Sequence, residues 1–156
     1  MLARSLRRIV GTGFTTLALA TAACGGDGGD STGPEPVPAD VTGTYALTGL
    51  RTLGNLNGGG SGMPVTFSDG GGSTLKFLSG QLVLVADGSY TLEVEAEFNG
   101  GSVTMTDEGL YGVDGADIDF DPTGDPKRMV SGTISGASIT ARTQFGGIPF
   151  EVDLDK

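Results

Sequence analysis

The chain has 156 residues, of which nine are basic and nineteen acidic, and its formal net charge is −10. It contains one cysteine and no histidine. These counts exclude Ser-His-Asp triads, Cys-His pairs and the usual zinc sites, because each of them needs histidine or several thiols. The acidic excess also argues against nucleic acid as a partner, since binding to a phosphate backbone depends on clustered Lys and Arg.

The first 23 residues have the three parts of a bacterial secretion signal. Arginines within the first eight residues supply a positive start, residues 9–20 are mostly apolar, and three small residues precede the single cysteine, Cys24. The uncharged stretch holds about 15 residues, whereas a membrane-spanning helix needs about 20. Residues 1–23 are therefore predicted to be a signal peptide. An ordinary secretory signal, which would leave Cys24 as a free thiol, is the alternative to a lipoprotein signal.

Ala22, Ala23 and Cys24 resemble the lipobox of bacterial lipoproteins, with Thr21 where Leu is usual. The resemblance implies that Cys24 carries acyl chains such as palmitate and that a membrane is a partner, because two acyl chains already give stable attachment. Gly25 occupies the position where an Asp would hold a Gram-negative lipoprotein in the inner membrane. The favoured location is therefore the outer membrane of the cell envelope.

Residues 24–40 combine Gly, Asp, Ser and Pro with almost no apolar side chain, so this segment is predicted to be a flexible linker. A linker of about 16 residues spans roughly 20 to 24 Å. Residues 41–156 remain for one domain with one core. Without residues 1–23, the chain keeps six basic and nineteen acidic residues, a net charge of −13.

The domain shows apolar residues at every second position, as expected for half-buried antiparallel strands. Asp87-Gly88 is the strongest hairpin signal, and it is expected to form a type I′ turn. Tight turns at short intervals predict a meander that closes into an all-β, up-and-down barrel of about 8 to 10 strands. The predicted strands are Gly43 to Leu50, Val65 to Phe67, Leu75 to Ala86 with a bend near Gly80, Ser89 to Phe98, Ser102 to Met105, Gly109 to Val113, Asp117 to Phe120, Arg128 to Ile134, Ser138 to Phe145 and Pro149 to Leu154.

Several of these pieces, in this order, resemble bacterial lipocalin-like domains. They are Gly43-Thr44-Tyr45 at the start of the domain, residues 84–92 in the middle, residues 109–120, and residues 131–140. True lipocalins open with Gly-x-Trp, and here Tyr45 takes the place of Trp. The resemblance implies a single barrel that holds a small apolar ligand in its interior.

The interior of such a barrel would be formed by Tyr45, Leu47, Leu84, Leu92, Val94, Phe98, Ile139 and Phe145. The first functional hypothesis is therefore a lipid-anchored, non-enzymatic module that binds a small hydrophobic ligand. The second is a structural or protein-interaction lipoprotein with a filled barrel core. An empty interior of a few hundred Å³ would favour the first hypothesis and a packed interior the second. The glycine-rich segment Leu53 to Met63 is a candidate lid over the open end.

No catalytic residue and no cofactor are expected. The acidic residues on the predicted strands are expected to point outward into solvent, which leaves carboxylates without the perturbed pKa values typical of catalytic groups. A weak calcium candidate is formed by Asp117, Asp119 and Asp121, which share one face of a predicted strand. Asp114 and Asp125 flank them. The spacing does not match an EF-hand loop. The competing interpretation is an acidic, outward strand face.

Overall fold

A computed structural model describes residues 40–124 and 128–156 of the chain. The predicted signal peptide (1–23), the predicted acylation site Cys24 and the predicted linker up to residue 39 lie outside the described residues. Among the described residues, no helix is long and apolar enough to cross a bilayer.

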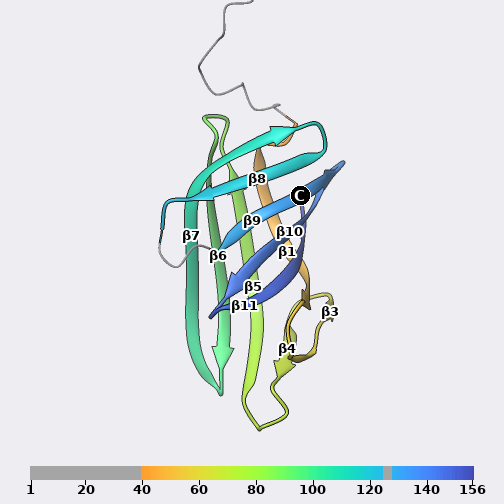
Figure 1. Cartoon of the computed structure of the whole chain (residues 1–156), viewed down its shortest axis with the longest axis vertical. Coiled ribbons are helices and arrows are strands. Elements are labelled where there is room, and N and C mark those ends of the chain that lie inside the picture. Colours follow the sequence, from red (N-terminus) through yellow and green to blue (C-terminus); the bar gives the residue numbers. More distant parts are fainter. Residues whose placement is uncertain (1–39, 125–127) are drawn as a thin grey trace, which may run out of the picture. The chain divides into compact units, whose positions relative to one another are not determined.

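The domain is a closed antiparallel barrel of eight strands, which confirms the predicted all-β, up-and-down barrel. Seven strands follow one another around the barrel in chain order, and β1 pairs with both the last and the first of them (Figure 1). Closure therefore gives every barrel strand a partner on each side. The barrel strands are β1 (Gly43–Thr52), β5 (Thr74–Leu84), β6 (Ser89–Phe98), β7 (Gly101–Asp114), β8 (Asp117–Pro122), β9 (Met129–Ser135), β10 (Ser138–Phe145) and β11 (Ile148–Asp155).

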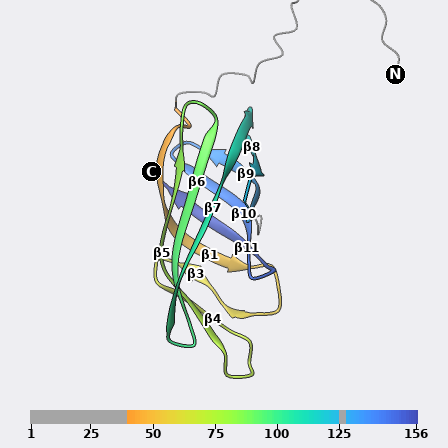
Figure 2. The ribbon, with the colours of Figure 1, turned by 90° about the vertical axis from the view of Figure 1, so that its left-hand side faces the viewer.

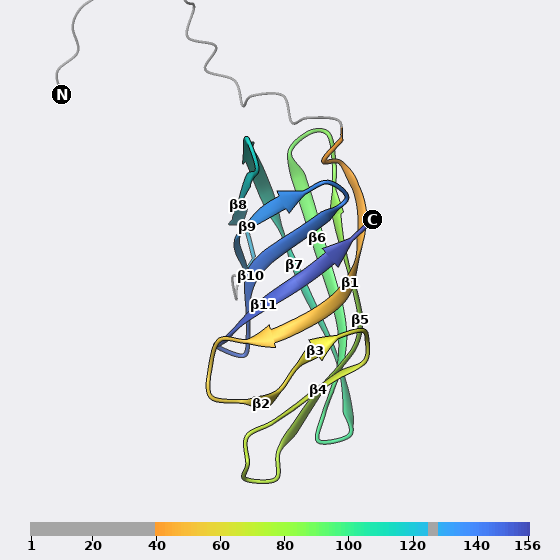
Figure 3. The same ribbon diagram turned by 90° about the vertical axis from the view of Figure 1, so that its right-hand side faces the viewer.

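Three short strands between β1 and β5 extend the sheet beyond the barrel (Figure 3). They are β2 (Asn57–Gly58), β3 (Gly60–Ser61) and β4 (Val65–Ser68), and they pair with β4, β1 and β5 respectively. The segment that was a candidate lid is thus hydrogen-bonded into the sheet. Gly58 shows why this segment is rich in glycine: its φ is +121°, and a Cβ there would lie 2.2 Å from the carbonyl oxygen of Thr66.

The alternation of apolar and polar residues is confirmed, with the apolar face turned into the barrel. On β6, Tyr90, Leu92, Val94 and Ala96 are buried while the residues between them are exposed or half-buried. The same pattern holds on β10 and β11. One continuous cluster of buried side chains results.

Phenylalanine rings from non-adjacent strands meet inside one end of the barrel. The ring of Phe77 on β5 lies 5.2 Å from that of Phe145 on β10 and 5.4 Å from that of Phe150 on β11. Phe67, on the additional strand β4, packs edge-on against Phe77 and Phe150 and is 1% exposed. Because β5 and β10 are separated around the barrel by β1 and β11, these contacts reach across the interior at this end of the barrel.

The hairpin turns differ in one respect from the prediction. Type I′ geometry requires positive φ at both central residues, and among the described turns that join consecutive barrel strands this occurs at Asn99-Gly100 (49° and 83°) and at Gly146-Gly147. At Asp87-Gly88 only Gly88 has positive φ, and its N–H donates to the carbonyl oxygen of Val85. The expected type I′ turn at Asp87-Gly88 is therefore wrong. The longer loop there is stabilised instead by the Asp87 carboxylate, which accepts hydrogen bonds from the backbone N–H and hydroxyl of Ser89.

Two strand predictions also change. The pieces predicted at Ser102 to Met105 and Gly109 to Val113 are one strand, β7, because β6 pairs with it without interruption from Gly101 to Leu110. The bend predicted near Gly80 appears as a register shift between Phe77 and Ser79. The short strands β2 and β3 were not predicted, since their glycines carry no period-two pattern.

Candidate functional site

The residues predicted to line the interior are, with one exception, brought together in the core. Tyr45, Leu47, Leu84, Leu92, Val94, Ile139 and Phe145 are each at most 5% exposed. The hydroxyl of Tyr45 donates to the carbonyl oxygen of Val41 over 2.7 Å, so this polar atom is satisfied without a ligand. These side chains pack against one another and against the phenylalanine cluster.

Phe98 is the exception, because it is 53% exposed. Phe98 lies on the same face of β6 as the buried residues Val94 and Ala96, but it is the last residue of that strand. At this end of the barrel the β6–β7 and β4–β5 hairpins extend past β10 and β11 (Figures 1 and 2). There it lines an apolar pocket of about 150 Å³ together with Leu56, Phe67, Leu75 and Ile148. The pocket therefore lies at the end of the barrel and not within its interior.

A buried carboxyl group closes the barrel wall between β7 and β9. Strand β8 pairs with β9 at three positions only, from Asp117↔Thr133 to Asp119↔Ser131. Beyond them, Asp107 Oδ2 of β7 accepts hydrogen bonds from the backbone N–H groups of Met129, at 2.8 Å, and Arg128, at 3.3 Å. The Arg128 guanidinium in turn donates to the carbonyl oxygen of Thr106. Side chains thus supply the connection that the β8–β9 ladder no longer provides.

Asp107 is held by the core as well as by the wall. It is 4% exposed, and the hydroxyl of Tyr90 donates to its Oδ2 over 2.8 Å. Its other oxygen, Oδ1, has no hydrogen-bond partner among the described residues. Burial raises the pKa of Tyr90, and the hydrogen bond to Asp107 raises it further. The sequence interpretation missed Asp107, although it has the inward phase of Met105 and Tyr111.

A second tyrosine is restrained in a similar way. Tyr111 on β7 is 6% exposed and donates its hydroxyl to the carbonyl oxygen of Val85 over 2.9 Å. Burial raises the pKa of Tyr111 to about 12, because the charged phenolate is disfavoured in the core.

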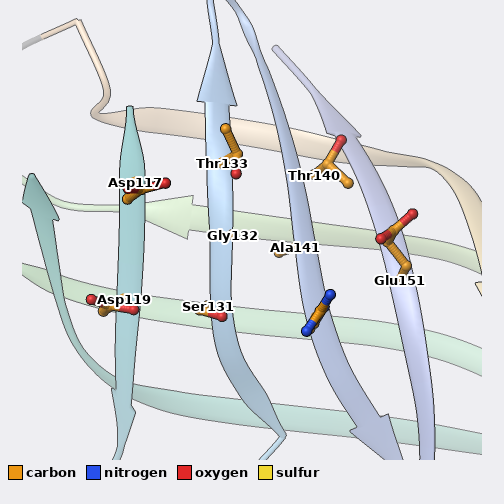
Figure 4. A pocket seen from close by; sticks show the side chains of 9 residues that line it. Asp117, Asp119, Ser131, Gly132, Thr133, Thr140, Ala141 and Glu151 are labelled. Atoms are coloured by element: carbon orange, nitrogen blue, oxygen red, sulfur yellow. The ribbon is translucent and has the colours of Figure 1, made fainter. Parts of the chain in front are cut away.

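A polar groove of about 390 Å³ crosses the outer surface of four strands, β8 to β11 (Figure 4). The register places its walls in two rows of outward side chains. The backbone of Gly132 and Ala141 lies between the two rows, where Gly132 has no side chain and Ala141 has only a methyl group. The first row is Asp117, Thr133 and Thr140, and the second is Asp119, Ser131, Arg142 and Glu151.

Hydrogen bonds divide this outer surface into a paired and an unpaired part. Next to the groove, the guanidinium of Arg51 on β1 binds Glu151 at 2.8 Å and Asp153 at 3.0 Å, and Thr140 donates to Asp153. The pKa of Arg51 is raised, first by its hydrogen bond to Glu151 and then by the negative charge of Asp153. Within the described residues, no side-chain hydrogen bond or ion pair involves the five remaining polar groups of the groove, which are Asp117, Asp119, Ser131, Thr133 and Arg142.

The calcium candidate is not assembled into a metal site in the described part of the chain. Asp117, Asp119 and Asp121 are exposed on the same face of β8, as predicted. Alternate residues of a strand are about 6.6 Å apart, so the three carboxylates are spread along the strand. Residues 40–124 and 128–156 contain no group of three or more His, Cys, Asp or Glu able to hold a metal ion. Asp125 lies outside the described residues.

Comparison with known proteins identifies no relative. No protein-family model, no curated protein and no solved structure matches this chain.

Proposed function

We propose that this chain is a lipid-anchored, non-enzymatic envelope protein whose barrel is a filled scaffold that acts through its outer surface. The anchor is the acylated Cys24 after removal of residues 1–23, and the favoured membrane is the outer membrane. The observation that carries the proposal is the contact between phenylalanine rings across the interior. A barrel filled in this way leaves the outer surface and the two ends for binding.

The position of the chain's entry supports this arrangement. Strand β1 begins at the end of the barrel opposite the β4–β5 hairpin (Figures 1 and 3). A membrane tether at the N-terminal side therefore leaves the far end of the barrel, with the β4–β5 and β6–β7 hairpins, accessible to partners. The lack of histidine and the outward direction of the carboxylates on β6 and β8 support the absence of an enzymatic activity.

A second candidate function is the binding of a small apolar ligand. It is favoured by the pocket at the barrel end, which is lined by Leu56, Leu75 and the half-exposed Phe98. The volume of about 150 Å³ is below the 300–1,000 Å³ of typical small-molecule sites. The filled scaffold is therefore the preferred proposal.

The first test separates the anchor from the cargo. Native mass spectrometry of the protein purified from its own membrane, followed by organic extraction, should show acyl chains on Cys24 and no second small molecule. Cys24→Ser should move the protein from the membrane fraction to the soluble fraction, because the acyl chains supply the attachment. Thr21→Leu, which restores the usual lipobox residue, is the matched control and should leave the protein in the membrane fraction.

The outcomes bear on different parts of the proposal. A Cys24→Ser protein that stays in the membrane fraction would overturn the anchor. A stoichiometric apolar molecule released by extraction would overturn the filled scaffold in favour of the second candidate.

A further inference from the structure

Three properties of the outer groove indicate the kind of ligand that it could bind. It has a volume of about 390 Å³, within the range of small-molecule sites. Its walls are polar, with hydroxyl, carboxyl and guanidinium groups in two rows. Most of these groups have no hydrogen-bond partner among the described residues, whereas those at the neighbouring β11–β1 surface are paired with one another.

The arrangement of charge in the row that contains Arg142 disfavours a simple anion or cation as the ligand there. Asp119 and Glu151 occupy the same cross-strand row as Arg142, one on each side of it, with Ser131 between Asp119 and Arg142. An anion attracted by the guanidinium meets these carboxylates, and a cation attracted by the carboxylates meets the guanidinium. For a charged ligand, electrostatic attraction to one group of this row is therefore opposed by repulsion from its neighbours.

A neutral ligand rich in hydroxyl groups satisfies all of these side chains. A hydroxyl both donates and accepts, so it can donate to Asp117 or Asp119 and accept from Arg142. The hydroxyls of Ser131 and Thr133 can take either role. Planar carboxyl and guanidinium groups also bind two neighbouring atoms at once, which suits hydroxyls on adjacent carbons of a sugar ring.

We propose that the groove across β8 to β11 binds a neutral saccharide, with Asp117, Asp119, Ser131, Thr133 and Arg142 as its main polar contacts. The proposal deepens the proposed function, because it rests on the outer surface being the binding surface and names the class of partner. It does not depend on acylation of Cys24. Failure of the membrane-fractionation test would leave it standing, and its own failure would leave the anchor standing.

The test measures binding of the full-length, detergent-solubilised protein to an array of neutral and acidic oligosaccharides that also carries oligolysine and oligoglutamate peptides. We expect binding to at least one neutral oligosaccharide. Asp119→Asn and Arg142→Gln should each weaken it about tenfold, the effect of losing a hydrogen bond to a charged group. Thr133→Val, which removes only a hydroxyl, should weaken it less.

Matched controls lie on exposed positions of the opposite wall. Thr91→Val on β6 is the counterpart of Thr133→Val, and Glu108→Gln on β7 is the counterpart of Asp119→Asn, because it also turns an exposed carboxylate into an amide. Both should leave binding unchanged. Circular dichroism and thermal unfolding of every variant check that the barrel is intact.

Three results would overturn the proposal. The first is the absence of binding to any neutral oligosaccharide on the array. The second is saccharide binding that the three groove variants leave unchanged. The third is preferential binding of oligolysine that Asp119→Asn weakens and Arg142→Gln strengthens, which would identify a cation-binding surface instead.

Discussion

Asp107 shows how one residue can replace part of a strand ladder. Its Oδ2 accepts from Tyr90 on β6 and from the backbone of Met129 on β9, so a single carboxyl group connects three strands. It does this where the β8–β9 pairing has ended. A buried backbone N–H must find an acceptor, and at Met129 the acceptor is a side chain.

The first prediction concerns this residue. Asp107→Ala should lower the free energy of unfolding by about 3 kcal/mol or more, because the N–H of Met129 and the hydroxyl of Tyr90 are left buried without an acceptor. Tyr90→Phe removes one donor only, and it should cost about 1.5 kcal/mol. Urea unfolding followed by circular dichroism measures both. Equal unfolding midpoints for the two variants would contradict this role of Asp107.

Strand β7 shows how close approach between elements selects glycine. Gly109 lies opposite Pro122 of β8, and a Cβ at Gly109 would be 2.2 Å from the carbonyl oxygen of Asp121. Gly112, three residues further along the same strand, has no heavy atom within 4 Å of the corresponding position. Identical residues of one strand thus have different constraints, which arise from the neighbouring strand.

The second prediction compares these two glycines. Gly109→Ala should destabilise the domain by roughly 1–3 kcal/mol, since the backbone of β8 has to move to admit a methyl group. Gly112→Ala is the matched control, and it should be neutral or slightly stabilising, because alanine restricts the unfolded chain. Thermal unfolding of both variants provides the measurement. A larger loss for Gly112→Ala would show that contacts with β8 do not constrain β7.

At the scale of the whole molecule, the barrel is closed by hydrogen bonds, and aromatic side chains from several strands meet in its core. Phe67, Phe77, Phe145 and Phe150 meet at one end, while the ring of Tyr90 lies 5.0 Å from that of Phe120 elsewhere in the core. Tyr90 and Tyr111 place their hydroxyls against acceptors inside the protein. Global stability should therefore depend on keeping these two phenols neutral.

The third prediction follows from the raised tyrosine pKa values. The pKa of Tyr111 rises from 10.0 to about 12 on folding, so the unfolded chain loses this proton first as the pH increases. The contribution is complete below pH 10.0 and is lost as the pH rises through about 12, and Tyr90 acts in the same direction.

Urea unfolding at about pH 9 and about pH 11 should show a lower midpoint at the higher pH. Tyr111→Phe, which cannot ionise, should lower stability at about pH 9 but reduce its dependence on pH. An unchanged pH dependence in Tyr111→Phe would contradict the assignment.

The sequence by itself determined the all-β class, the strand order and the inward face of most strands. Where apolar residues alternate along a strand, as at Leu92, Val94 and Ala96, only one orientation of a pleated strand with a single buried face buries them all. Turn residues separated the strands, although the type I′ geometry belongs to Asn99-Gly100 and not to Asp87-Gly88. These features are local, so they can be read from neighbouring residues.

Only the tertiary structure decided which strands close the barrel, what fills it and which outer residues form a groove. Pairing of β1 with β5 and β11 joins residues far apart in the chain, and the Phe77–Phe145 contact crosses the interior. Asp107 is buried and Phe98 is exposed, against the usual behaviour of their residue types, because the extent of neighbouring strands sets their surroundings. The groove likewise depends on the register of four strands. No local pattern specifies such long-range pairing, because each strand alone is compatible with several registers and partners.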